Sequence, residues 1–291
     1  MMQICFVTCS KEPALTKDDL LLSRYLLNKN ISVVPAIWDD ITVNWQAYDA
    51  IILRSMWDYH TRIDEFNAWL DKLELLGCIV LNPVSIVKWN QNKKYLADLS
   101  SQGALLPPYH FCLQNSITRL NDIMAINNWD KAVIKPAVSG GSFNTWTTTA
   151  LSVAADELRF AEMLQYGDVI VQKFMDEIIT NGELSLMFFD KKFSHAILKK
   201  AKPGDFRVQS QFGGTDEPAY PVESVIKKAQ ALLNTINEPL LYARVDGILL
   251  NNDEFYLMEL ELIEPALFIE SDENACENFY VAFHNLLFGK S

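Results

Sequence analysis

Two carboxylates lie two residues apart in an apolar run near the C-terminal end of this sequence. Residues 257–263 are apolar except for Glu259 and Glu261. Because side chains alternate along a β-strand, both carboxylates point to the same face. A second apolar run covers residues 242–250, and the turn-rich stretch 251–254 separates the two runs. This pattern predicts a β-hairpin.

The hairpin predicts which residues lie opposite each other. In its simplest register three pairs form: Phe255 with Leu250, Glu259 with Asp246, and Glu261 with Arg244. Carboxylates that face each other repel, so the arrangement favours a divalent cation, and oxygen ligands suit Mg²⁺. The alternative is a solvated acidic face on an edge hairpin. Against that alternative, the same face is expected to carry five apolar residues: Ile248, Leu250, Phe255, Leu257 and Ile263.

A lysine and a Gly/Ser-rich loop follow another predicted strand. The strand at 132–135 ends in Lys135, and the loop that follows contains four small residues: Ser139, Gly140, Gly141 and Ser142. Backbone amides of such a loop can approach a phosphate closely while the ammonium group supplies charge. The spacing matches neither a Walker A loop nor GxGxxG. A simple turn between two strands is the alternative interpretation.

Two further segments suit a nucleotide and a reacting anion. A buried-looking strand at 169–175 ends in polar residues, and Glu183 opens the next strand. A strand end can offer backbone groups to a base, and Glu183 can accept hydrogen bonds from ribose hydroxyls, although a surface glutamate is the alternative. Residues 199–207, which include Lys199 and Arg207, form the most basic segment. Arg207 suits a bidentate contact to a carboxylate or phosphate, and a solvated charged face is the alternative.

Composition excludes several classes of protein. The chain has 291 residues and a formal net charge of −12, which argues against a nucleic-acid partner held through phosphates. The sequence contains no run of about 20 apolar residues, so no membrane-spanning helix is predicted. The five dispersed cysteines fit reduced thiols in a cytoplasmic protein. No HExxH or GxSxG motif occurs, so neither a zinc protease nor a serine hydrolase is indicated.

Hydrophobic patterns predict the elements that position these residues. The first ninety residues alternate strands at 4–8, 32–37, 50–53 and 78–81 with helices at 20–27 and 66–76, which is typical of a small parallel α/β layer. The remainder predicts strands at 132–135, 145–149, 168–174, 184–189 and 193–199, with helices at 93–101, 117–127, 154–164 and 222–236. Strand-rich segments with interposed helices favour an α+β part with antiparallel sheets.

Taken in order, these segments resemble the ATP-grasp superfamily. The resemblance rests on Val-Ile-Lys-Pro at 133–136 with its Gly-rich loop, Gln-Lys-Phe-Met at 172–175, Gly-Glu-Leu-Ser at 182–185, Gly-Asp-Phe-Arg at 204–207, Arg-Val-Asp at 244–246 and Glu-Leu-Glu at 259–261. The branch it is most similar to contains prokaryotic glutathione synthetase and the O-ureido-serine cyclo-ligase of cycloserine biosynthesis. The run Arg-Ser-Met-Trp-Asp-Tyr at 54–59 is similar to an element of the cyclo-ligase-like branch.

The resemblance implies a fold and a reaction. The fold is an N-terminal pre-ATP-grasp parallel α/β domain at 1–88, followed by two α+β lobes at 89–178 and 179–291 that enclose ATP. The reaction is an ATP- and Mg²⁺-dependent ligation, in which a small-molecule carboxylate becomes an acyl phosphate that an amine or similar nucleophile attacks. Neither nucleic acid nor a membrane is an expected partner, and homodimer and homotetramer are both left open. The alternatives are an ATP-binding protein without ligase activity and a metal-dependent phosphohydrolase.

The resemblance also assigns roles by position. ATP phosphates would contact Lys135, the loop of Ser139, Gly140, Gly141 and Ser142, and a helix lysine, either Lys94 or Lys93, with Lys94 favoured. The adenine hinge would comprise Gln172, Lys173, Phe174 and Met175, and the ribose acceptor would be Glu183 or Glu177. Mg²⁺, or Mn²⁺ in its place, would be held by Asp246, Glu259 and Glu261, although many family members have Asn at the last position. Arg207, assisted by Lys199, would steady the acyl phosphate. Substrate contacts would come from Arg54, Trp57, Asp58 and Tyr59.

Overall fold

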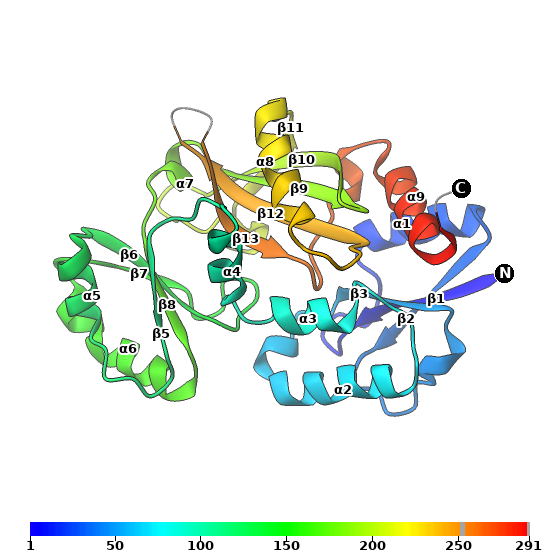
Figure 1. Ribbon diagram of the computed structural model, residues 1–291, viewed down its shortest axis with the longest axis horizontal. Coiled ribbons are helices and arrows are strands. Elements are labelled where there is room, and N and C mark those ends of the chain that lie inside the picture. Colours follow the sequence, from blue (N-terminus) through cyan, green and yellow to red (C-terminus); the bar gives the residue numbers. More distant parts are fainter. Residues whose placement is uncertain (251–253, 290–291) are drawn as a thin grey trace.

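The computed structural model describes residues 1–250 and 254–289, and three sheets organise them (Figure 1). Each sheet is built from a different stretch of the chain, in the order in which the sequence predicts an α/β part and then antiparallel parts. No helix in these two ranges is both long and apolar enough to cross a membrane.

The first sheet is parallel, as predicted, with the strand order β2-β1-β3-β4. Its elements are β1 (Met2–Thr8), α1 (Lys17–Asn28), β2 (Ile31–Ile37), β3 (Ala50–Ser55), α2 (Ile63–Leu75) and β4 (Val80–Leu81), with 3₁₀ turns at Trp45–Ala47 and Tyr59–Thr61. One apolar face is covered by α2, through Phe66 and Leu70. The other is covered by α1 and by α9 (Ala275–Phe288), which lie side by side in Figure 1. The C-terminal end of the chain therefore returns to the first sheet.

The second sheet is antiparallel and lies at one end of the molecule (Figure 1). It has the order β5-β8-β6-β7 and contains β5 (Tyr109–Cys112), α5 (Leu120–Asn127), β6 (Lys131–Pro136), β7 (Trp146–Thr149), α6 (Val153–Tyr166) and β8 (Val169–Lys173). Helices α5 and α6 pack on one face of this sheet. The opposite face is left to the cavity described below.

The third sheet is also antiparallel, with the order β11-β10-β9-β12-β13. It comprises α7 (Glu177–Thr180), β9 (Glu183–Phe189), β10 (Lys192–Lys200), a 3₁₀ turn at Ser210–Phe212, β11 (Thr215–Ala219), α8 (Glu223–Asn234), β12 (Tyr242–Leu249), β13 (Phe255–Glu261) and a 3₁₀ turn at Ile269–Ser271. Helices α3 (Val84–Asn90) and α4 (Tyr95–Ser101) join α8 on its apolar face. The segment around residue 93 is thereby fixed to the third sheet.

The β12–β13 hairpin forms, but its register differs from the prediction at one end. Phe255 pairs with Leu249 and not with Leu250. A bulge at Met258 then adds one residue, so that Asp246 lies opposite Glu259 and Arg244 opposite Glu261, as expected. The predicted turn at 251–254 falls mostly on residues 251–253, which are outside the described residues.

Because of the bulge, the predicted set of apolar residues on the carboxylate face is wrong. Phe255 and Leu257 pack with the core beneath α8, on the side away from the carboxylates. Ile248 and Leu250 instead pack with Met258 beside the cavity. The strand alternates regularly on each side of the bulge, but the extra residue exchanges the two faces.

The close approach at the bulge requires a glycine in β12. A Cβ at Gly247 would lie 2.3 Å from Phe255 Cζ and 2.6 Å from the carbonyl oxygen of Tyr256. We expect Gly247→Ala to destabilise the protein by about 1–3 kcal/mol, because either the Phe255 ring or the hairpin backbone must move. The measurement is the urea unfolding midpoint at an unchanged slope. Gly167→Ala is the control, since its Cβ meets open space, and an equal loss in both variants would contradict the interpretation.

Candidate active site

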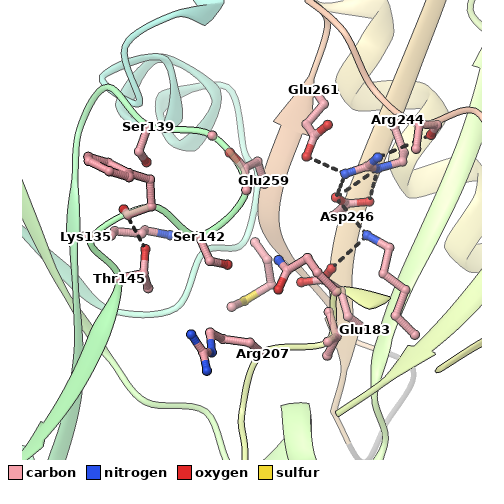
Figure 2. Close-up of a pocket in the computed structure, with 18 of the residues that line it drawn as sticks. Lys135, Ser139, Ser142, Thr145, Glu183, Arg207, Arg244, Asp246, Glu259 and Glu261 are labelled. Carbon is pink, nitrogen blue, oxygen red and sulfur yellow. Dashed lines mark hydrogen bonds and ion pairs between the residues drawn. The ribbon is translucent and has the colours of Figure 1, made fainter. Parts of the chain in front are cut away.

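A cavity of about 770 Å³ lies where the three sheets meet. Most residues that the sequence nominates line it, from the Gly-rich loop to the β12–β13 carboxylates. Figure 2 shows Lys135, Ser139 and Ser142 on one side, with Arg244, Asp246 and Glu183 across from them and Glu259 between. Segments more than a hundred residues apart in the chain therefore form one site.

Alternating charges connect one wall of the cavity. Asp246 is 2% exposed and accepts from Arg244 Nη2 at 2.9 Å, from Lys199 Nζ at 3.4 Å and from the Ser185 hydroxyl at 2.5 Å. Burial alone would raise the pKa of Asp246, but the two cations outweigh it and lower the pKa to about 2. Lys199 also pairs with Glu183 at 3.1 Å. Asp246 is therefore held ionised.

The second predicted carboxylate pair extends this network. Arg244 also pairs with Glu261, and Lys93 Nζ lies 3.1 Å from Glu259. Burial raises the pKa of Glu261 to about 8. The charge of Arg244 opposes this rise, whereas the charges of Asp246 and Glu259 add to it. Negative charge is thus incompletely compensated at this end of the strand.

The lysine after β6 is placed as the sequence predicts. Lys135 Nζ donates to Gln172 Oε1 at 3.1 Å, and Lys93 Nζ donates to the Ser139 carbonyl at 3.0 Å. Burial lowers the pKa of Lys135 to about 8, partly offset by Glu259. Gln172, assigned to the adenine hinge, therefore directs its side chain to this lysine. Two ammonium groups and the loop amides face the same space.

The helix lysine favoured from the sequence lies elsewhere. Lys94 is absent from the cavity lining, pairs with Asp168 at 2.8 Å and lies over the Phe111 ring. Lys93 lines the cavity and is 6% exposed. The two neighbours precede α4 and point in different directions, so the preference for Lys94 is corrected in favour of Lys93. Likewise Glu183 lines the cavity whereas Glu177 does not.

One end of the cavity is apolar. Val133, Phe174, Ile178 and Met258 line it and pack together. The Lys173 amide donates to Pro108 and the Phe174 amide to Lys131, both within the protein. The Met175 amide has no partner among the described residues, so it is the free donor of the predicted hinge.

Two loops close over the opposite end. Residues 201–214 carry Arg207, which pairs with Asp205 at 2.8 Å and stacks on Phe212 at 3.7 Å. Gln211 Nε2 donates to the Gly141 carbonyl at 3.0 Å. From the first sheet, His60 packs on Phe143 at 5.3 Å between ring centroids. The Gly-rich loop is therefore contacted from two sides, and Arg207 reaches the cavity edge.

The four predicted substrate contacts separate into two groups. Trp57, Asp58 and Tyr59 line the cavity. Arg54 does not; it lines a neighbouring hollow, pairs with Asp19 at 2.7 Å and donates to the Pro265 carbonyl at 3.1 Å. Arg54 thus supports the backbone beside the cavity.

The sequence analysis missed Glu264. Regular alternation along β13 would direct it away from Glu259 and Glu261, but the strand ends at Glu261 and Glu264 lines the cavity. Burial raises the pKa of Glu264 to about 7. Pro265 was the available signal, because proline disfavours continuation of a paired strand.

Cations separate the carboxylates that the sequence predicts as metal ligands. Among the described residues, no three Asp, Glu, His or Cys side chains converge closely enough to form a metal-binding group. Asp246, Glu259 and Glu261 share the same wall, but Arg244 and Lys93 are interleaved with them. Their oxygen donors nevertheless have the chemistry that Mg²⁺ prefers.

Known proteins resemble this chain in sequence and in fold. Residues 4–82 match the family described as D-cycloserine synthetase DcsG, N-terminal domain. The cycloserine biosynthesis protein DcsG of Streptomyces lavendulae is 27% identical over 253 residues, which are 83% of this chain and 84% of that protein. The crystal structure of D-cycloserine synthetase DcsG has a TM-score of 0.86 at 25% identity, covering 98% of this chain and 99% of that one.

A more distant likeness concerns the fold alone. The D-alanine–D-alanine ligase from Bacillus anthracis, in a crystal structure complexed with ATP, has a TM-score of 0.67 at 14% identity. It covers 99% of this chain and 97% of that chain. The arrangement of all three sheets is therefore shared with a structure that holds a nucleotide.

The Arg54–Asp19 pair makes a prediction about stability. Both side chains are about 2% exposed, so Asp19→Ala leaves a buried guanidinium without its counter-charge. We expect a loss of about 3–5 kcal/mol in the free energy of unfolding, measured by denaturant titration. Lys17→Ala is the control: it removes an exposed ion pair to Glu270 and should cost less than about 1 kcal/mol. Similar losses in both variants would show that Arg54 does not depend on Asp19.

Proposed function

We propose that this chain is an ATP-grasp ligase related to D-cycloserine synthetase, and that it joins a small-molecule carboxylate to an amine or similar nucleophile. ATP would convert the carboxylate into an acyl phosphate, and attack on the acyl carbon would release ADP and phosphate. The ATP-grasp fold and the relationship to ligases agree with the expectation from the sequence.

One observation carries the proposal. Lys135 and the Gly-rich loop face Asp246 and Glu259 across a single cavity, and Lys93 lies between them, donating to the loop and pairing with Glu259. Cations and loop amides suit phosphates, and carboxylates opposite them suit a divalent cation that binds the same phosphates. Lys135 and the loop belong to the second sheet and the carboxylates to the third, as gripping a nucleotide between lobes requires.

We assign the nucleotide by the chemistry of the lining. The adenine base would lie at the apolar end between Val133 and Met258, where the Met175 amide can donate to it. The ribose would lie near Glu183. The phosphates would meet Lys135, Lys93 and the loop from Ser139 to Ser142. Binding a phosphate would favour the charged form of Lys135, whose pKa burial has lowered.

We assign Mg²⁺ to Asp246 and Glu259, with Glu261 as a further ligand. The donors are all oxygens. Burial, together with the charges of Asp246 and Glu259, raises the pKa of Glu261, and a divalent cation would favour its ionised form. When bound there, Mg²⁺ neutralises phosphate charge. Mn²⁺ shares this ligand preference. Arg207 and Lys199 lie in the lining where a transferred phosphoryl group would carry negative charge, and such positioned cations stabilise it.

The three-part division at 1–88, 89–178 and 179–291 is proposed with this function, although α4 packs with the third sheet. Tyr59, Trp57 and Asp58 would bring the first part to the substrate end of the cavity. We also propose a cytoplasmic location, because all five cysteines are free thiols.

An ADP-release and hydroxamate assay tests the function. Purified protein receives ATP, Mg²⁺, hydroxylamine and a panel of amino acids, dipeptides and ureido compounds. We expect carboxylate-dependent ADP release, with hydroxamate formed as hydroxylamine intercepts the acyl phosphate. Glu259→Gln should abolish both while circular dichroism stays unchanged. A native protein that binds no Mg²⁺–ATP in calorimetry would refute the proposal.

The two adjacent lysines provide a matched pair of variants. We expect Lys93→Met to raise the Kd for Mg²⁺–ATP at least about tenfold, which corresponds to about 1.4 kcal/mol. Lys94→Met should change it less than about twofold, because that ammonium group pairs with Asp168 outside the cavity. Isothermal titration calorimetry makes the comparison, and equal effects would remove Lys93 from the phosphate site.

A further inference from the structure

The backbone after β13 is held by side chains along its whole length. Six consecutive carbonyls, residues 262–267, each accept a hydrogen bond from a side chain: Asn82 (2.8 Å), Tyr242 (2.8 Å), Trp57 (3.4 Å), Arg54 (3.1 Å), Arg244 (3.2 Å) and His195 (2.9 Å), in that order. These donors come from the first and third sheets. An irregular segment needs partners for its buried carbonyls, and here the partners also fix its course.

Glu264 lies at the centre of this segment and its side chain lines the cavity. Among the described residues, no side chain donates to its carboxylate, which meets only its own backbone amide. Four other carboxylates of the lining each have a lysine or arginine partner: Glu183, Asp246, Glu259 and Glu261. Glu264 is therefore held in place without a counter-charge.

A second side chain beside it is also without a partner. Tyr59 is 5% exposed and lines the cavity, and its hydroxyl makes no hydrogen bond to any described residue. The Tyr59 hydroxyl oxygen is unpaired but not fully buried. Part of the small exposed area of Tyr59 therefore belongs to this oxygen. Burial, and after it the charges of Glu264, Glu261 and Glu259, raise the pKa of Tyr59, whose side chain lines the same cavity as these carboxylates.

Aromatic rings complete this corner. The Trp57 indole nitrogen donates to the Glu264 carbonyl at 3.4 Å, so the two residues are adjacent, and Trp57 is 43% exposed while lining the cavity. A carboxylate, a hydroxyl and aromatic rings together favour an organic ammonium group, which gains a charge-assisted hydrogen bond and cation–π attraction.

We propose that Glu264 and the Tyr59 hydroxyl bind the ammonium group of the ligase's substrate. The inference rests on the proposed function, because that function supplies the acyl phosphate beside Glu259 and Glu261. Glu264 lies three residues beyond Glu261 on the fixed segment. Before it can attack, the ammonium group held there would lose one proton to the Glu264 carboxylate; the resulting amine would then attack the acyl carbon and phosphate would leave. Bringing two reactants together in this way accelerates their reaction.

Methylammonium tests the site without knowledge of the natural substrate. In the hydroxamate assay, methylammonium chloride should inhibit the native protein relative to sodium chloride at equal ionic strength, because it competes where the amine binds. Glu264→Gln should raise the inhibition constant at least about tenfold, and Tyr59→Phe about three- to tenfold. Hydroxylamine, uncharged near neutral pH, should keep its KM within about twofold in Glu264→Gln. Glu162→Gln, on the exposed face of α6, is the control and should match the native protein.

A thermal-shift measurement separates this inference from the proposed function. Methylammonium should raise the melting temperature of the native protein and not that of Glu264→Gln, with no turnover needed. If the native protein forms no hydroxamate but shows this shift, the ligase proposal fails and the ammonium site stands. If hydroxamate forms and both proteins respond equally to methylammonium, the ammonium site is refuted. A tenfold higher Mg²⁺ requirement in Glu264→Gln, with unchanged methylammonium inhibition, would also refute it.

Discussion

Charge compensation inside the cavity wall is the constraint on which this structure depends. Asp246 is almost inaccessible to water, and an unpaired carboxylate in such a place costs several kcal/mol. Lys199 and Arg244 compensate it, and both are themselves buried. Removing Lys199 would leave Glu183 without its ion-pair partner, and removing Arg244 would do the same to Glu261. The third sheet therefore depends on β9, β10 and β12 keeping their mutual register.

The same constraint connects the three sheets to one another. Lys93, which precedes α4, compensates Glu259 on β13 and also donates to the Gly-rich loop. Arg54 and Trp57 extend from the first sheet to the backbone after β13. Compensation is less complete around Glu261 and Glu264, whose pKa values are raised. Burial is the main cause of these raised pKa values, and a cationic ligand, such as the proposed metal ion or ammonium group, would favour the ionised carboxylates.

Local patterns predicted most elements because each depends on short-range spacing. The parallel first layer, the antiparallel remainder and the charge-bearing strands follow from periodicity and breakers. The hairpin pairing of Asp246 with Glu259 was also predicted, although the assumed turn pairing was wrong and the bulge at Met258 compensated for it. Strands β5 and β11 and helices α3, α7 and α9 were not predicted. The buried residues of α9, among them Phe279 and Phe283, do recur at helical spacing, so that signal was present and was missed, whereas the packing of α9 against α1 is a tertiary feature.

The sequence by itself determined which residue types meet, since the order of lysine, glycine loop, arginine and paired carboxylates is a property of the chain. Only the tertiary structure decided between Lys93 and Lys94, removed Arg54 from the cavity and brought Glu264 into it. The physical reason is direction. Spacing predicts a side chain's face only while the backbone is regular. Lys93 and Lys94 lie before a helix and Glu264 beyond the end of a strand, where long-range hydrogen bonds set the course of the chain. Arg54 lies within β3, and its ion pair with Asp19 holds it in the neighbouring hollow.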